Sequence, residues 1–170
     1  MKTLYLLRHA KSDWGGPGLE DHERPLNARG REAARRMGRH IAGLQPQPAL
    51  VLCSSSVRTR ETWALLGAAL PDQPAIGFES GLYLASPRDI LACINRIEDE
   101  PEAALVIGHN PGMEDLAQAL PAGGDRAAME RVRTKYPTAA LATFTFDCRW
   151  RDLDFGLAEL NGFVRPKDLS

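Results

Sequence analysis

The sequence predicts an α/β fold built on a parallel sheet. Three short apolar runs, at residues 3–7, 49–52 and 103–107, have the length and composition of buried strands. Segments with helical periodicity separate each run from the next, as in consecutive βαβ units. Because 170 residues with 44% hydrophobic positions are enough for one core, we expect a single domain over residues 1–170.

Three helices are expected around these strands. Asn27 can cap the first helix and Gly43 can end it, while Ser86 followed by Pro87 forms a good start for the third. In each helix, apolar residues recur every three or four positions, which predicts one buried face: Ala33, Met37, Ile41 and Leu44; Trp63, Leu66 and Leu70; Ile90, Ile94 and Ile97.

The remaining segments predict less regular structure. Residues 140–146 and 153–160 alternate like strands and predict a hairpin or a pair of edge strands near the C-terminus. Residues 15–25 are polar and rich in glycine, which indicates an exposed loop directly after the first strand.

Charge and cysteine content exclude several classes of function. The formal net charge is −1 and there is no block of lysine and arginine, so we expect no nucleic-acid partner. The arginines between Arg29 and Arg39 are interpreted as the solvated face of a helix, the alternative being attraction of an anionic partner protein or substrate. The three cysteines are widely separated, which favours buried thiols over a disulfide or a zinc site.

From the first residues we expect neither a signal peptide nor a membrane anchor. The apolar stretch that begins the chain ends at Arg8 and lacks a small-residue cleavage site. We therefore expect a cytoplasmic protein without a membrane partner, and take a monomer as the default state.

Polar residues follow three of the predicted strands. Arg8 and His9 end the first, residues 54–58 with Arg58 follow the second, and His109 follows the third. Because parallel strands place ligands beyond their carboxyl ends, these residues are expected to converge on one site. Guanidinium groups bind phosphoryl oxygens and a neutral imidazole can attack phosphorus, so the set favours phosphoryl transfer. No P-loop motif is present.

Four sequence blocks carry a resemblance to a known family. They are residues 7–13 (LRHAKSD), 24–30 (RPLNARG), 54–62 (SSSVRTRET) and 106–112 (VIGHNPG). Together, in this order, they resemble the histidine phosphatase superfamily and its small phosphohistidine phosphatase branch (SixA-like). The resemblance implies a three-layer fold like that of phosphoglycerate mutase, with a mostly parallel central sheet flanked by helices, and a reaction without a metal ion or other cofactor.

The same resemblance assigns roles to four residues. His9 is the expected nucleophile, Arg8 and Arg58 hold the phosphoryl oxygens, and a protonated His109 completes the pocket. Further contacts to the phosphate or the substrate are expected from Lys11, Ser12, His22 and Asn110.

The sequence departs from the superfamily pattern at two places. Ala10 stands where most members have glycine, as is common in the small branch, and Gly15 stands where mutase-type members carry an asparagine phosphate ligand. Mutase activity is therefore not expected.

The general acid is the least defined role. Glu79 is the first candidate and Asp13 the second, and a surface or capping role is the alternative for both. A phosphorylated imidazole leaves as a nitrogen base, so a phosphohistidine phosphatase needs only weak acid catalysis.

The sequence thus predicts a phosphatase that forms a phosphohistidine intermediate on His9. The expected substrate is phosphohistidine in a protein. The alternatives are a small phosphorylated substrate, handled by a broad phosphomonoesterase with an essential acid, and a noncatalytic module that binds phosphohistidine.

Overall fold

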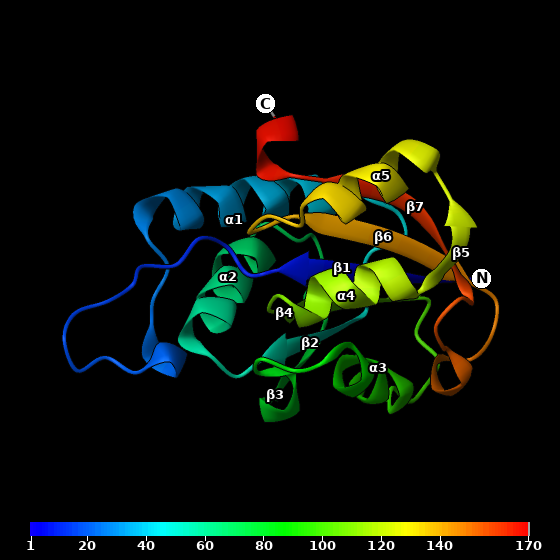
Figure 1. Cartoon of the computed structure of the whole chain (residues 1–170), viewed down its shortest axis with the longest axis horizontal. Helices are drawn as coiled ribbons and strands as arrows, with labels where there is room; N and C mark the ends of the chain where they lie inside the picture. The colour runs from blue at the N-terminus through cyan, green and yellow to red at the C-terminus, as the bar shows by residue number, and fades with distance from the viewer. Residues whose placement is uncertain (170) are drawn as a thin grey trace.

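The computed structural model describes residues 1–169 and is built on one seven-stranded sheet (Figure 1). The strand order across the sheet is β3-β2-β4-β1-β6-β7-β5. Neighbouring strands are parallel except for β6, which is antiparallel to both β1 and β7. The strands are β1 (Lys2–Arg8), β2 (Leu50–Ser54), β3 (Ala75–Glu79), β4 (Ala103–Gly108), β5 (Pro121–Gly124), β6 (Leu141–Phe146) and β7 (Ala158–Val164).

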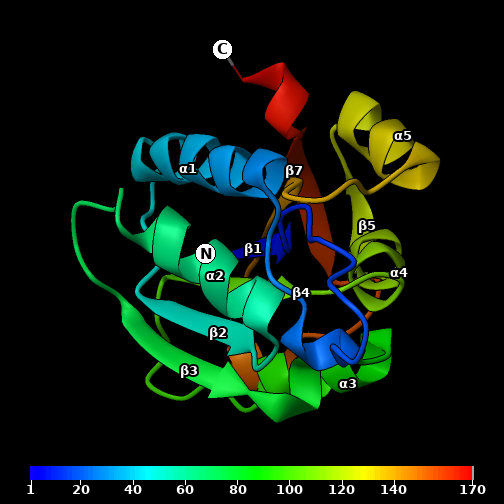
Figure 2. The same cartoon turned by 90° about the vertical axis from the view of Figure 1, so that its left-hand side faces the viewer.

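Helices cover both faces of the sheet (Figure 2). They are α1 (Ala28–Ala42), α2 (Val57–Gly67), α3 (Pro87–Asn95), α4 (Gly112–Ala119) and α5 (Arg126–Thr134). Leu4 and Leu6 of β1 point into a core with α3, α4 and α5, whereas Tyr5 and Leu7 point into a second core with α1 and α2. The predicted three-layer α/β fold is therefore confirmed. No helix within residues 1–169 has the length and apolar character needed to cross a membrane.

The predicted strands and helices in the first two thirds of the chain are confirmed. Asn27 caps α1, its Oδ1 accepting from the Gly30 amide at 2.8 Å, and Ser86 caps α3, its Oγ accepting from the Asp89 amide at 3.1 Å. Met37, Ile41 and Ile94 are fully buried, as the apolar periodicity predicts.

The C-terminal part differs from the prediction. β6 and β7 do form an antiparallel pair, but β7 begins at Ala158, and residues 153–157 are not strand. The pair is also not at an edge, because β6 contacts β1 and β5 lies outside β7. The late start of β7 has a physical cause: the buried Trp150, whose Nε1 donates to the Pro101 carbonyl at 2.8 Å, anchors a 3-10 turn at Trp150–Asp152 just before the segment predicted as strand.

The segment between β1 and α1 returns across the carboxyl ends of the strands. Residues 13–20 are exposed, as expected for a loop, and Asp21–Glu23 then form a short 3-10 helix. Ser12 and Leu26 form an antiparallel bridge that joins the two arms of the loop. Gly30 allows α1 to pack against this segment, because a Cβ at position 30 would lie 1.9 Å from the Lys11 carbonyl oxygen.

Candidate active site

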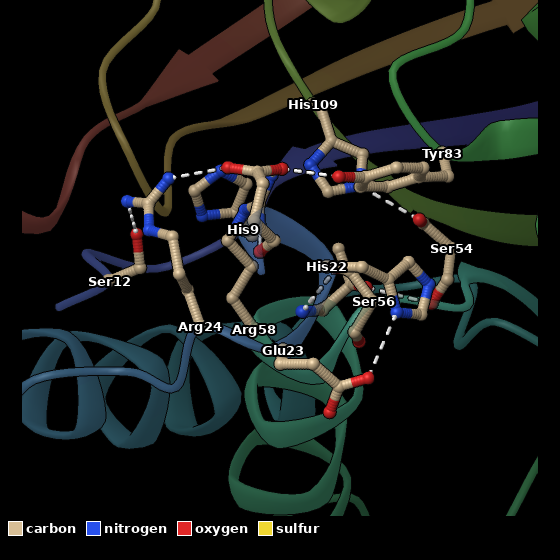
Figure 3. Close-up of polar contacts among 12 residues, drawn as sticks. His9, Ser12, His22, Glu23, Arg24, Ser54, Ser56, Arg58, Tyr83 and His109 are labelled. Atoms are coloured by element: carbon tan, nitrogen blue, oxygen red, sulfur yellow. Dashed lines mark hydrogen bonds and ion pairs between the residues drawn. The ribbon is translucent and has the colours of Figure 1, made fainter. Parts of the chain in front are cut away.

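The carboxyl ends of β1, β2 and β4 bring together the four residues that the sequence singled out, of which Figure 3 labels His9, Arg58 and His109. Arg8 is paired with Gly108 across β1 and β4, and the next residue along each strand is a histidine. The His9 and His109 ring centroids are 5.2 Å apart. Arg58 enters from the first turn of α2, which follows β2.

His9 is oriented by the chain that follows it. Its Nδ1 lies 2.7 Å from the Ala10 carbonyl oxygen and donates its hydrogen there, which leaves Nε2 with a free lone pair. The Ala10 amide donates to Thr62 Oγ1 at 3.0 Å, so α2 holds this turn in place. Burial lowers the pKa of His9 to about 3, and Arg8, Arg58 and Arg24 add to the effect. His9 is therefore a neutral imidazole at neutral pH.

The two expected arginines are buried around the histidines. Arg58 is only 3% exposed, and Arg8 is partly buried, with its Nη1 donating to the Tyr136 carbonyl at 3.0 Å. The Nε atoms of both arginines are buried and have no hydrogen-bond partner within residues 1–169. Such donors can form hydrogen bonds to the oxygens of an oxyanion.

His109 is held by a serine that precedes α2. Its Nε2 lies 2.7 Å from Ser54 Oγ, whereas its Nδ1 is buried without a partner in the described part of the chain. Burial lowers the pKa of His109 to about 3, and His9 and Arg58 contribute in the same direction. The expectation of a protonated His109 is thus not met in this structure: desolvation and nearby cations favour the neutral ring. If Ser54 donates to Nε2, the Nδ1 of this neutral ring carries a hydrogen.

Asp21 and Arg24 are site residues that the sequence reasoning missed. Asp21 Oδ2 accepts from Arg58 Nη2 at 3.0 Å and from the Tyr83 hydroxyl, and Asp21 Oδ1 accepts from Arg24 Nη1 at 2.8 Å. The Tyr83 hydrogen bond and the two arginines hold the pKa of Asp21 well below its usual range. Asp21 lies in the segment interpreted as an exposed loop, and Arg24 belongs to the second sequence block, which was the one available signal.

Three of the four further contact residues predicted from sequence form hydrogen bonds to groups around this centre, and Lys11 does not. Ser12 Oγ accepts from Arg24 Nη2 at 2.7 Å, and His22 Nε2 lies 2.9 Å from Ser55 Oγ. Asn110 donates to the Tyr136 carbonyl at 2.9 Å, the same oxygen that Arg8 uses. Lys11 is exposed, and its backbone carbonyl accepts from the Asn27 amide.

Neither candidate acid is joined to the histidines. Glu79 lines a separate hollow with Leu52, Cys93 and Arg96, on the side of β3 that faces α3. Asp13 is exposed, and its Oδ1 accepts from the Gly15 amide at 3.4 Å. Within residues 1–169, no hydrogen bond connects either carboxylate to His9 or His109.

The chemistry of the site follows from these groups. Two neutral imidazoles lie beside three guanidinium groups, a set that can bind an oxyanion and present a nitrogen nucleophile to it. In the described residues, no three His, Cys, Asp or Glu side chains gather as ligands of a metal ion would. The fixed positive charge of the site comes from arginine side chains.

Comparisons with known proteins agree with this arrangement. The family model for the histidine phosphatase superfamily (branch 1) matches residues 4–81. An uncharacterized protein of Mycobacterium tuberculosis is 36% identical over 163 residues, which cover 95% of this chain and 100% of that protein.

Two solved structures extend the similarity over the whole fold. A proposed phosphohistidine phosphatase SixA from Nakamurella multipartitia matches with a TM-score of 0.85 and 28% identity, covering 97% of this chain and 96% of that chain. A proposed SixA from Agrobacterium tumefaciens matches with a TM-score of 0.81 and 27% identity, covering 97% and 98% of the two chains. With its sheet, its motif blocks and its paired histidines, the chain belongs to the histidine phosphatase superfamily and is similar to SixA-type members of it.

Proposed function

We propose that this protein is a phosphatase that removes the phosphoryl group from phosphohistidine in a protein substrate. The observation that carries the proposal is the state of His9. Its Nδ1 hydrogen is directed to the Ala10 carbonyl 2.7 Å away, its pKa is lowered to about 3, and its ring lies among arginines. The Nε2 atom is therefore an unprotonated nucleophile next to donors for an oxyanion.

In the first step, His9 Nε2 attacks phosphorus. A bond forms between His9 and phosphorus while the bond between phosphorus and the substrate nitrogen breaks. Arg8, Arg58 and Arg24 supply fixed positive charge to the phosphoryl oxygens, and His109 Nδ1 donates a hydrogen bond to one of them. The unpartnered, buried Nε atoms of Arg8 and Arg58 and the unpartnered Nδ1 of His109 support these roles.

The acids available to the site support a nitrogen leaving group. Glu79 and Asp13 make no hydrogen bond to the histidines, and the depressed pKa of Asp21 keeps it ionised. An alkoxide needs a strong proton donor when it departs. A phosphorylated imidazole can carry a proton on its other ring nitrogen before the reaction, so it departs as neutral imidazole without an acid from the protein.

In the second step, water attacks the phosphorus on His9. The bond between phosphorus and Nε2 breaks, phosphate leaves, and the neutral imidazole is restored. Only His9 forms a bond to phosphorus. Substitution of His9 therefore removes the covalent intermediate, whereas substitution of His109 removes a hydrogen bond to the phosphoryl group.

The test compares turnover of two substrate classes by the whole protein. Purified protein is assayed on a histidine-phosphorylated carrier protein and on simple phosphate esters, with His9→Ala as the inactive variant and His40→Ala, a helix residue outside the site, as the matched control. We expect preference for phosphohistidine that disappears in His9→Ala and survives in His40→Ala. Preference for esters would replace the proposal with a general phosphomonoesterase, and binding without turnover would replace it with a recognition module.

A further inference from the structure

A cleft of about 780 Å³ lies between α1, α5 and the chain after β7. Among the described residues, the one acidic residue that lines the cleft is Glu32. Six cationic side chains line it: Arg29, Arg36, Arg131, Lys135, Arg165 and Lys167. The whole chain has a net charge of −1, so positive charge is concentrated here far above the average. Two of the six, Arg29 and Arg36, belong to the arginine cluster interpreted from sequence as a solvated helix face.

Half of this positive charge has no partner within the protein. Arg36 pairs with Glu32 at 3.6 Å, and Asp168 pairs with Arg131 at 3.6 Å and with Arg165 at 2.8 Å. Within residues 1–169, the remaining three cations form no ion pair and are exposed to solvent: Arg29, Lys135 and Lys167. Their charge is available to a bound anion.

The cleft is joined to the active site by one short segment. Lys135, Pro137 and Thr138 line the cleft, while the intervening Tyr136 gives its carbonyl oxygen to Arg8 and Asn110. Figure 2 looks onto the carboxyl ends of the central strands: α1 begins there, and the chain after β7 and the end of α5 lie along the same edge. A protein surface docked over His9 would extend across this edge.

We propose that the cleft binds an acidic segment of the phosphoprotein substrate, an inference that rests on the proposed function. The cations complement carboxylates, and apolar side chains between them, such as Ala33, Pro137 and Pro166, can contact the aliphatic part of a peptide. The lining has no aromatic, asparagine or glutamine side chain among the described residues, so a nucleotide base would find neither an aromatic ring to stack on nor a side-chain amide to read it.

The first experiment measures binding without catalysis. Fluorescence anisotropy follows a labelled oligoglutamate peptide with wild-type protein, with Arg29→Glu/Lys135→Glu/Lys167→Glu, and with the control Arg35→Glu/Arg126→Glu/Arg151→Glu. Both triple variants change the net charge equally, and the control residues are exposed and lie outside the cleft. We expect the cleft variant to bind at least about tenfold more weakly than wild type, because three attractive charges become repulsive, while the control stays within about twofold.

The second experiment uses turnover as a ratio. The kcat/KM for a histidine-phosphorylated protein is divided by that for a small phosphoramidate, and this ratio should fall in the cleft variant and stay constant in the control. Thermal melts identify any folding defect, and the neutral Arg29→Gln/Lys135→Gln/Lys167→Gln variant should then give a smaller change in the same direction.

Three outcomes would overturn the inference. They are no binding of oligoglutamate by wild type at physiological salt, equal losses in the two triple variants, and tight binding of ATP in the cleft without binding of the peptide. Failure of the proposed function is distinguishable, because it would appear as absent phosphohistidine turnover in wild type while peptide binding is measured independently.

Discussion

Both terminal nitrogens of Arg58 donate hydrogen bonds to Asp21. Nη1 donates to the Asp21 carbonyl oxygen at 2.8 Å and Nη2 donates to Oδ2 at 3.0 Å, while the other carboxylate oxygen accepts from Arg24. The carboxylate thus accepts from the kind of fork that binds phosphoryl oxygens in the proposed mechanism. An ionised aspartate and a phosphoryl group would compete for these donors.

This competition predicts the behaviour of Asp21→Asn. The amide keeps one acceptor oxygen but loses the negative charge, so inorganic phosphate should inhibit the variant more strongly, with an inhibition constant lower by roughly threefold to tenfold. Inhibition of phosphoramidate hydrolysis by phosphate measures it, and Asp154→Asn, which removes a surface charge near Arg88, is the control. An unchanged or higher inhibition constant would show that Asp21 does not compete with the anion.

The buried histidines predict a loss of stability in acid. Burial lowers the pKa values of His9 and His109 to about 3, while an unfolded chain protonates its histidines near pH 6.5. Between these values the unfolded chain binds more protons than the folded one, so the free energy of unfolding falls as pH drops below about 6.5. The upper limit at pH 5 is about 2 kcal/mol for each histidine.

Urea unfolding at pH 7 and pH 5 measures this effect. The difference in the free energy of unfolding between pH 7 and pH 5 should be smaller in His9→Gln/His109→Gln than in wild type, because glutamine does not titrate. Equal differences in wild type and variant would mean that other groups cause the acid sensitivity.

Ser54 is predicted to support His109. Its hydroxyl is buried and lies 2.7 Å from His109 Nε2, so Ser54→Ala leaves that nitrogen without its partner and the ring free to adopt another tautomer. We expect kcat/KM to fall by about tenfold and the free energy of unfolding by about 1–3 kcal/mol. Ser80→Ala, at an exposed position, is the control for both measurements. Full activity in Ser54→Ala would show that the hydroxyl of Ser54 does not support His109.

Gly30 is predicted to be irreplaceable by alanine. The added Cβ would lie 1.9 Å from the Lys11 carbonyl oxygen, and because the neighbour is backbone, α1 or the segment after His9 must move. Gly30→Ala should therefore lose more than about 2 kcal/mol of stability together with activity. Gly43→Ala is the matched control, since the nearest atom to its Cβ would be 3.6 Å away. Similar melting temperatures for the two variants would contradict this packing argument.

The parts of the fold that sequence could predict are those with strong local signals. Three strands are continuous apolar runs, and Asn27, Ser56 and Ser86 cap the helices that they precede. β3 and β5 were not predicted. β3 is an edge strand with Ile76 and Phe78 partly exposed, and β5 is the short, glycine-rich Pro121–Gly124, so neither carries the pattern of a buried strand.

The site residues also divide into those that a local sequence signal predicts and those that depend on a distant contact. His9, Arg8, Arg58 and His109 lie where buried strands end or the next helix begins, and strand order alone brings such positions together. Asp21 belongs to the site through a contact with Arg58, 37 residues further along the chain, which no local pattern encodes. Glu79 lies close along the chain to Tyr83, but it lines a separate hollow with Cys93 and Arg96, while Tyr83 contacts Asp21.

Trapping the phosphorylated enzyme tests directly whether His9 is the nucleophile. Wild-type protein is mixed with a phosphoramidate or a histidine-phosphorylated protein, quenched within milliseconds under conditions that preserve phosphohistidine, digested, and examined by mass spectrometry. We predict a phosphoryl group on His9 that forms and decays at rates consistent with turnover and is absent from His9→Ala. Turnover without any phosphorylated His9, or with the phosphoryl group on His109 instead, would contradict it.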